Sequence, residues 1–145
     1  MTRISHLRAH EILDSRGNPT LDVWCALDDG THAHASVPSG ASTGSHEAHE
    51  LRDNDTKRYG GLGVLQAIDH VTNDIFHDVH NKDLDQRSLD TALIKLDGTP
   101  HKSRLGANAI LGVSLAFARA SARQKRIELY EHIGALAHNT VFSLP

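Results

Sequence analysis

Residues 37–53, VPSGASTGSHEAHELRD, place hydroxyl side chains between and beside two glycines, followed by carboxylates and histidines. The hydroxyl and glycine positions are Ser39, Gly40, Ser42, Thr43 and Gly44. Hydroxyl, carbonyl and carboxylate oxygens are ligands that Mg²⁺ accepts, together with water and substrate phosphate oxygens. The stretch is therefore suited to supplying part of a Mg²⁺ shell, although composition alone favours a plain mobile connection.

A nucleotide-binding P-loop is the other glycine-rich loop to consider. Such a loop carries glycines at fixed offsets and a lysine followed by serine or threonine, which bind the phosphates. The segment SGASTG has only Gly40 and Gly44, and it contains no lysine. The sequence therefore does not predict a P-loop.

The chain has twelve histidines, and two pairs have the spacing of metal ligands. His32 and His34 would lie on one face of a strand, and His46 and His49 would lie on one face of a helix. No carboxylate or thiol completes either pair at a recognised spacing. Surface histidines are therefore the favoured interpretation.

Length and charge limit the class of protein. The 145 residues correspond to one domain, 1–145, with 39% hydrophobic and 23% charged residues and a net charge of -3. This charge, without a Lys/Arg cluster, argues against a nucleic-acid partner, and no apolar run predicts a membrane span. The single Cys25 and the absence of a signal-peptide pattern fit the cytoplasm.

One β-leaning segment and two alternating segments predict an antiparallel meander. The expected strands cover residues 4–13, 20–27 and 31–37. Turn-forming residues separate them at Asp14–Pro19 and at Asp28–Gly30.

The pattern then changes to helical spacing. Apolar stripes predict helices through Val64, Leu65, Ile68, Val71 and Ile75, and through Leu89, Leu93 and Leu96, with a stop at residues 97–100. Residues 105–122 are small and apolar almost all round, which predicts a buried helix with Leu111 and Leu115 in the core. Strands followed by helices indicate an α+β fold, with a helical bundle packed on one face of the sheet.

Four segments together resemble the N-terminal domain of enolase, phosphopyruvate hydratase. They are ILDSRGNPT at 12–20, VPSGASTG at 37–44, HEAHELRDND at 46–55 and KSRLGANAILGVSLAFARA at 102–120. The resemblance implies a small α+β domain that precedes an α/β barrel, and this barrel is absent from the chain. It also implies a lyase of glycolysis that dehydrates 2-phosphoglycerate to phosphoenolpyruvate with Mg²⁺.

The resemblance assigns a role to the opening loop. Ser39, Gly40, Ala41, Ser42, Thr43 and Gly44 would form the loop that closes over substrate, and Ser42 would be a Mg²⁺ ligand. The base would be a lysine and the acid a glutamate, and both would lie in the barrel. The resemblance therefore assigns no catalytic residue to this chain. The 145-residue chain alone is expected to be inactive.

Other conspicuous residues have structural interpretations. Asp14 and Arg16 are expected to form a buried ion pair in a turn, and His46 and Glu47 to begin a helix, either capping it or approaching the active site. The family's contact between this domain and a partner's barrel makes Asp22 an interface candidate in a homodimer.

Departures from the family pattern at His10, His49, Gly60, Leu62 and His101 leave two alternatives. One is a diverged enolase paralogue acting on a phosphonate analogue, and the other is a stand-alone binding or interaction module. Some family members are also found at the cell surface or secreted, so these locations remain open beside the cytoplasm.

Overall fold

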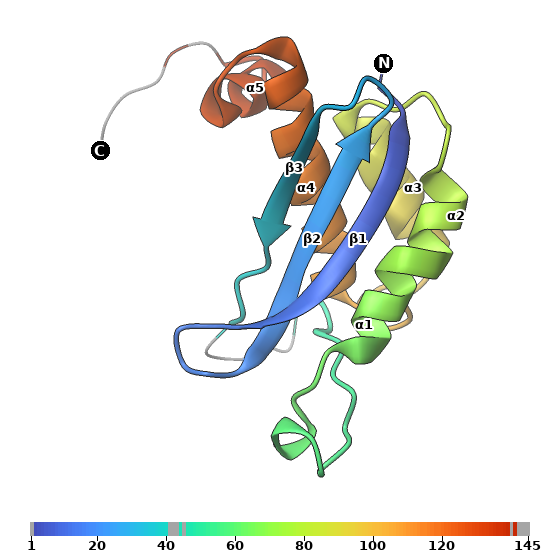
Figure 1. Ribbon diagram of the computed structural model, residues 1–145, viewed down its shortest axis with the longest axis vertical. Helices are drawn as coiled ribbons and strands as arrows, with labels where there is room; N and C mark the ends of the chain where they lie inside the picture. The colour runs from blue at the N-terminus through green and yellow to red at the C-terminus, as the bar shows by residue number, and fades with distance from the viewer. Residues whose placement is uncertain (1, 41–43, 45, 140, 142–145) are drawn as a thin grey trace.

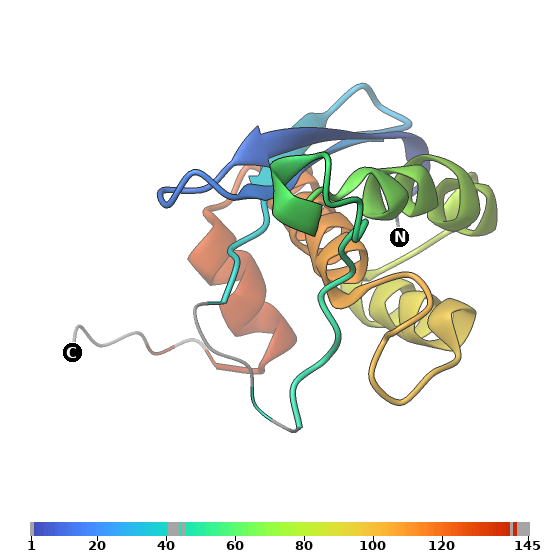
Figure 2. The same cartoon turned by 90° about the horizontal axis from the view of Figure 1, so that it is seen from below.

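The computed structural model describes residues 2–40, 44, 46–139 and 141. A three-stranded sheet forms one layer and the helices form a second layer against one of its faces (Figures 1 and 2). The α+β prediction and the placement of the helices on one face are therefore confirmed. Among the described residues, no helix has the length and apolar character needed to cross a membrane.

The sheet is a meander in the order β1-β2-β3, with both pairs antiparallel. Its strands are β1 (Ile4–Leu13), β2 (Pro19–Leu27) and β3 (His32–Ser36). Alternate side chains point into the core, which is why the period-2 pattern was informative. The buried positions include Leu7, Ala9, Leu21, Val23, Cys25, Leu27, Ala33 and Ala35.

The helical layer follows the predicted stripes. It contains η1 (Tyr59–Gly61, a 3₁₀ turn), α1 (Leu65–His70), η2 (Val71–Ile75, a π turn), α2 (Phe76–Val79), α3 (Gln86–Asp97), α4 (Ala107–Lys125) and α5 (Leu129–Leu136). α4 packs on β2 and β3, whereas α1, η2 and α2 pack on β1. The predicted stop is confirmed, since α3 ends at Asp97 and Gly98 adopts a left-handed conformation.

α4 approaches the sheet closely at Gly112. A Cβ atom on this glycine would lie 2.5 Å from Val23 Cγ2 and 3.0 Å from Val37 Cγ2. The face of α4 that meets the sheet is therefore made of small residues around one large side chain, Phe117, which is 1% exposed. The small residues let the helix axis sit near the strands and bring its first turn over the end of β3.

The prediction that Leu111 is buried is wrong. Leu111 is 41% exposed, and Leu115 is partly buried against the core. The buried face of α4 runs through Ala109, Gly112, Val113, Ala116, Phe117 and Ala120, a set at helical spacing that excludes Leu111. Because α4 is apolar almost all round, its sequence did not show which side would face the sheet.

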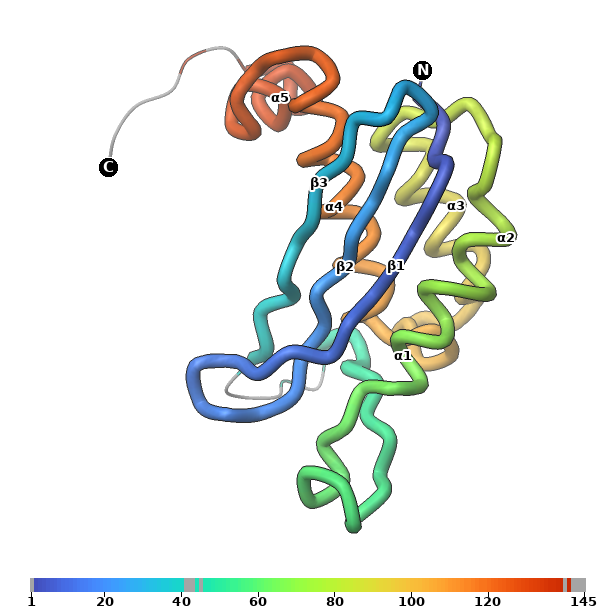
Figure 3. The backbone as a smooth tube through the Cα atoms, viewed as in Figure 1, coloured from blue at the N-terminus to red at the C-terminus, as the bar shows by residue number. Residues whose placement is uncertain are grey.

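The predicted helix beginning at His46 and Glu47 is also wrong. His46 and Glu47 lie in a turn, and the chain from Ala48 to Asp55 forms neither helix nor strand. In Figure 3 this part of the chain runs away from the sheet and returns to α1. The carboxylate of Asp53 accepts hydrogen bonds from the backbone N–H groups of Leu65 (2.8 Å) and Gln66 (2.9 Å), so it caps α1 instead of a helix of its own.

Candidate functional site

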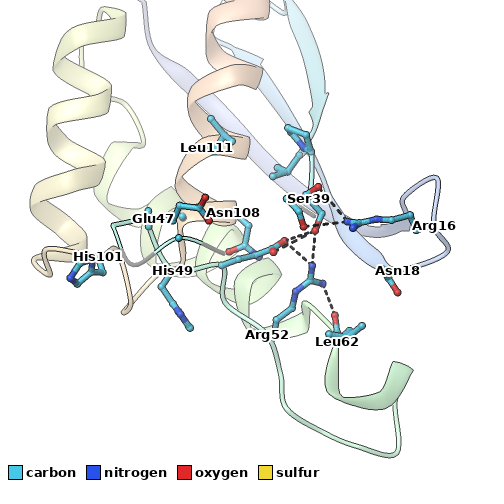
Figure 4. A pocket seen from close by; sticks show the side chains of 17 residues that line it. Arg16, Asn18, Ser39, Glu47, His49, Arg52, Leu62, His101, Asn108 and Leu111 are labelled. Atoms are coloured by element: carbon cyan, nitrogen blue, oxygen red, sulfur yellow. Dashed lines mark hydrogen bonds and ion pairs between the residues drawn. The ribbon is translucent and has the colours of Figure 1, made fainter. Parts of the chain in front are cut away.

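A pocket of about 730 Å³ lies where the β1–β2 turn, the chain after β3, residues 47–52 and the first turn of α4 meet. Figure 4 shows Arg16, Ser39 and Arg52 on one side of this pocket, with His49 and His101 on the other. The exposed side chain of Leu111 lines it as well. The residue whose burial was predicted wrongly therefore belongs to the wall of the pocket.

The predicted substrate loop contributes directly to this pocket. Ser39, Gly40 and Gly44 line it, together with Glu47, whose N–H donates to the Gly44 carbonyl at 3.2 Å. The other predicted loop residues, Ala41, Ser42 and Thr43, lie outside the described residues. The Mg²⁺ role assigned to Ser42 therefore stays a prediction.

Arg16 holds the start of this loop from the β1–β2 turn. Its guanidinium donates to the carbonyls of Ser39 and Gly40, at 3.4 Å each, and pairs with Asp14 at 3.2 Å. The expected ion pair exists, but it is not buried, because the Arg16 side chain is 43% exposed. Hydrogen bonds from the N–H groups of Asn18 and Arg16 outweigh the desolvation of the Asp14 carboxyl and lower its pKa.

Arg52, which follows the loop in the chain, contacts the first residue of the loop. One guanidinium nitrogen donates to Ser39 Oγ (3.1 Å) and to a Glu50 carboxylate oxygen (2.7 Å). Ser39 Oγ in turn donates to Glu50 at 3.2 Å. The other terminal nitrogen of Arg52 donates to the carbonyls of Pro19 (2.6 Å) and Leu62 (2.7 Å), so a single side chain joins four groups.

The chain beyond the loop is fixed to the start of α4. Asn108 is 3% exposed and forms two hydrogen bonds with the backbone of Leu51, accepting at 3.1 Å and donating at 3.0 Å. The backbone N–H of His49 donates to the His101 carbonyl (2.6 Å), and the His49 carbonyl accepts from the Ala107 N–H (2.7 Å). The far wall of the pocket is therefore held by backbone pairing without a regular strand.

Arg52, Glu50 and Asn108 were not singled out from the sequence. Two of them carried a signal, since Arg52 is the one Arg or Lys within HEAHELRDND and Asn108 is polar inside an apolar helix. A polar group in such a position requires a hydrogen-bond partner once it is buried. The partner itself was not visible, because it lies up to 57 residues away along the chain.

The histidine pairs do not come together as metal sites in the described part of the chain, where no group of three or more His, Cys, Asp and Glu side chains is placed to hold an ion. His32 and His34 share the open face of β3, as the alternation predicted. His34 instead hydrogen-bonds Asp22 at 3.0 Å. His46 and His49 do not share a helix face because no helix forms there.

Asp22 lies on the face of the sheet that the helices do not cover. Desolvation opposes ionisation of this carboxyl, but hydrogen bonds from His34 and Ser36 outweigh it, so the pKa of Asp22 is lowered. The Asp22 carboxylate is therefore ionised and held in place by His34 and Ser36. Its position on the non-core face agrees with the expectation for this strand.

The meander sheet and its helical layer form a small α+β domain, with a pocket beside Ser39, Gly40 and Gly44. Comparison with known proteins shows that this is the N-terminal domain of an enzyme family. Residues 4–133 match the family described as "Enolase, N-terminal domain". The chain is 58% identical over 133 residues to "Enolase 1" of Chlorobaculum tepidum, and the match covers 91% of this chain and 31% of that protein. The chain therefore belongs to the enolase family and spans about a third of the length of this curated relative.

Proposed function

We propose that this chain is the N-terminal domain of a Mg²⁺-dependent lyase that dehydrates 2-phosphoglycerate to phosphoenolpyruvate in glycolysis. The observation that carries the proposal is the 58% identity to an enolase across 91% of the chain. The geometry supports it, because Ser39, Gly40 and Gly44, the described residues of the SGASTG segment, line the pocket of about 730 Å³.

In this proposal the domain closes the site and the barrel performs the proton transfers. Residues 39–44 form the substrate loop, and Ser42 gives one ligand to Mg²⁺. The described pocket wall supports the proposal with oxygen groups of the kind that a hard cation accepts, the carboxylate of Glu47 and backbone carbonyls, which lie beside the cationic side chains of Arg16 and Arg52. Bound Mg²⁺ would stabilise the negative charge that develops on the substrate carboxylate.

The partners follow from the same proposal. They are the substrate, the chain's own C-terminal barrel, and a second subunit in a homodimer, with the cytoplasm as the location. Asp22 is the proposed interface residue on this domain. Its ionised state and its fixed position beside His34 support a role in pairing with a cationic group of the partner.

The test uses the full-length protein and its Ser42→Ala variant. Phosphoenolpyruvate formation from 2-phosphoglycerate should require Mg²⁺ in the wild type, and the variant should lose roughly 100-fold or more in kcat. Thermal melting should be almost unchanged if the role of Ser42 is to bind Mg²⁺ in the closed complex. A loss of activity fully explained by unfolding would reject the metal role of Ser42.

A second measurement separates the proposal from its alternatives. The isolated 145-residue chain, freed of host enolase, should show no turnover, because no residue in the matched motifs corresponds to the base or the acid. Turnover by this chain alone would contradict the assignment of both proton transfers to the barrel. A full-length protein that prefers a phosphonate analogue over 2-phosphoglycerate would be a diverged paralogue.

A further inference from the structure

The first residue of the substrate loop and the chain that follows the loop meet through side chains. Ser39 stands immediately before Gly40, while Glu50 and Arg52 stand beyond the loop. The three side chains close a ring, since Arg52 donates to Ser39 Oγ and to Glu50, and Ser39 Oγ donates to Glu50. The ring thus ties the beginning of the loop to the chain that follows it.

Each group in the ring uses a different hydrogen-bonding capacity. The Ser39 hydroxyl has one proton, which goes to Glu50, and its lone pair accepts from Arg52. The carboxylate of Glu50 accepts from both neighbours, at 2.7 Å and 3.2 Å. Because the Arg52 side chain is only 15% exposed, these charge-assisted contacts are partly shielded from water and are stronger than a surface pair.

The ring is anchored on the rigid part of the domain. Through its second nitrogen Arg52 holds the carbonyl of Pro19, the first residue of β2, and the carbonyl of Leu62, which follows η1. Between Glu50 and Arg52, Leu51 is fixed by Asn108 at the first turn of α4. The loop therefore departs from a point that β2 and α4 together define, as Figure 4 shows for Ser39 and Arg52.

We propose that Ser39, Glu50 and Arg52 form a clamp that positions the substrate loop. None of the three is assigned a contact with substrate or metal, so they are positioning residues. The clamp fixes where Gly40 leaves the domain, and thereby limits where Ser42 can reach when the loop closes. The inference rests on the function proposed above, since it concerns the placement of that metal ligand.

Ser39→Ala is the sharpest test, because it removes one oxygen from the ring and leaves the charges and the backbone in place. Full-length protein should keep its melting temperature but lose roughly 10- to 100-fold in kcat, the size expected for a small misplacement of a reacting group. Half-saturation by Mg²⁺ should shift to a concentration several-fold higher. Amide hydrogen exchange over residues 36–53 should become faster even without substrate.

Ser5→Ala is the matched control. Ser5 is also partly buried, and its hydroxyl donates to the carbonyls of Ala26 and Leu27, away from the pocket. Its kcat, Mg²⁺ dependence and exchange over residues 36–53 should equal those of the wild type. This control separates loss of the clamp from loss of any serine hydroxyl.

A double-mutant cycle with Glu50→Gln tests whether the residues act as a unit. If the ring exists, the two changes together should cost kcat about as much as either alone, because the second removes a contact that is already broken. Additive losses would overturn the clamp. So would Ser39→Ala with wild-type kinetics and exchange while the wild type turns over normally, a result that leaves the proposed function standing. A wild type without turnover would overturn the proposed function and with it the catalytic role of the clamp.

Discussion

The sheet with α4 and the chain from Pro38 to Val64 are held together in different ways. In the first region, buried apolar side chains from strands and helix share one core, and α4 approaches β2 so closely at Gly112 that a Cβ atom there would clash with Val23. Among the described residues of the second region only η1 is regular structure, and single polar groups fix the backbone.

This difference determines what each region can do. Apolar packing distributes its free energy over many atoms, so the sheet and α4 form a stable platform with one arrangement. The polar contacts of the second region act one at a time, and each can be changed without unfolding the platform. The pocket lies on the border between the two regions, with Leu111 and Asn108 from the platform and Arg52 from the irregular chain.

The largest effect should come from the platform. Phe117→Ala should lower the free energy of unfolding by about 3 to 5 kcal/mol, because it opens a cavity under the sheet. Leu111→Ala, on the same helix, should cost less than about 1 kcal/mol, since Leu111 lies on the pocket side and is half exposed. Urea denaturation of both variants measures this comparison, and equal midpoints would contradict the facing of α4.

The two regions also differ in how far the sequence predicts them. Alternation placed β2 and β3, and residues that favour strands placed β1. Stripes at helical spacing placed α1, η2 and α3, and a long run of small apolar residues placed α4. The facing of Leu111 was not predictable, since α4 carries apolar residues on nearly every side. Leu111 is exposed because its side chain lines the pocket.

Distant partners explain the remaining errors. Residues 46–55 carry helix-forming and capping residues, yet Asp53 caps α1 and Glu50 pairs with Arg52, so these two carboxylates bind groups outside a local helix. The local part of the pocket, Ser39, Gly40 and Gly44, was assigned to the substrate loop by the family resemblance, because composition alone favoured a plain connection. The part that depends on folding, such as the contact of Asn108 with Leu51, was not predicted.

The next effect in size concerns the place where the irregular chain joins β1. Glu11 accepts from Arg58 and from the N–H of Val64 at 3.0 Å. The hydrogen bond from Arg58 is the main cause that lowers the pKa of Glu11 below its ordinary value of 4.5. Glu11→Gln should cost roughly 1 to 2 kcal/mol at pH 7, because partial exposure of Arg58 screens the pair.

The stabilisation that Glu11 provides should decrease on acidification. Because the native state keeps Glu11 ionised at pH values where the unfolded chain binds a proton, the stabilisation is present above pH 4.5 and is lost as the pH falls through the lowered native pKa. The difference between wild type and Glu11→Gln in urea midpoint should therefore shrink on acidification. The control is Glu47→Gln, which replaces an exposed carboxylate that follows the substrate loop. A difference that stays constant down to pH 3 would reject the linkage.

The smallest effect should come from the cap that joins residue 53 to α1. The two carboxylate oxygens of Asp53 take up the first free N–H groups of α1, those of Leu65 and Gln66, from twelve residues upstream. Asp53→Ala should therefore cost about 1 kcal/mol, the usual value of a helix cap, and Asp53→Asn should recover part of it by keeping one acceptor. Asp78→Ala, which removes an exposed i,i+4 pair with Lys82, should change the urea midpoint by no more than a few tenths of a kcal/mol. Amide exchange locates the effect, since opening should increase at Leu65 and Gln66 and not in α4. If exchange instead rose equally across α4, the cap would be part of the platform and the two regions would not be separable.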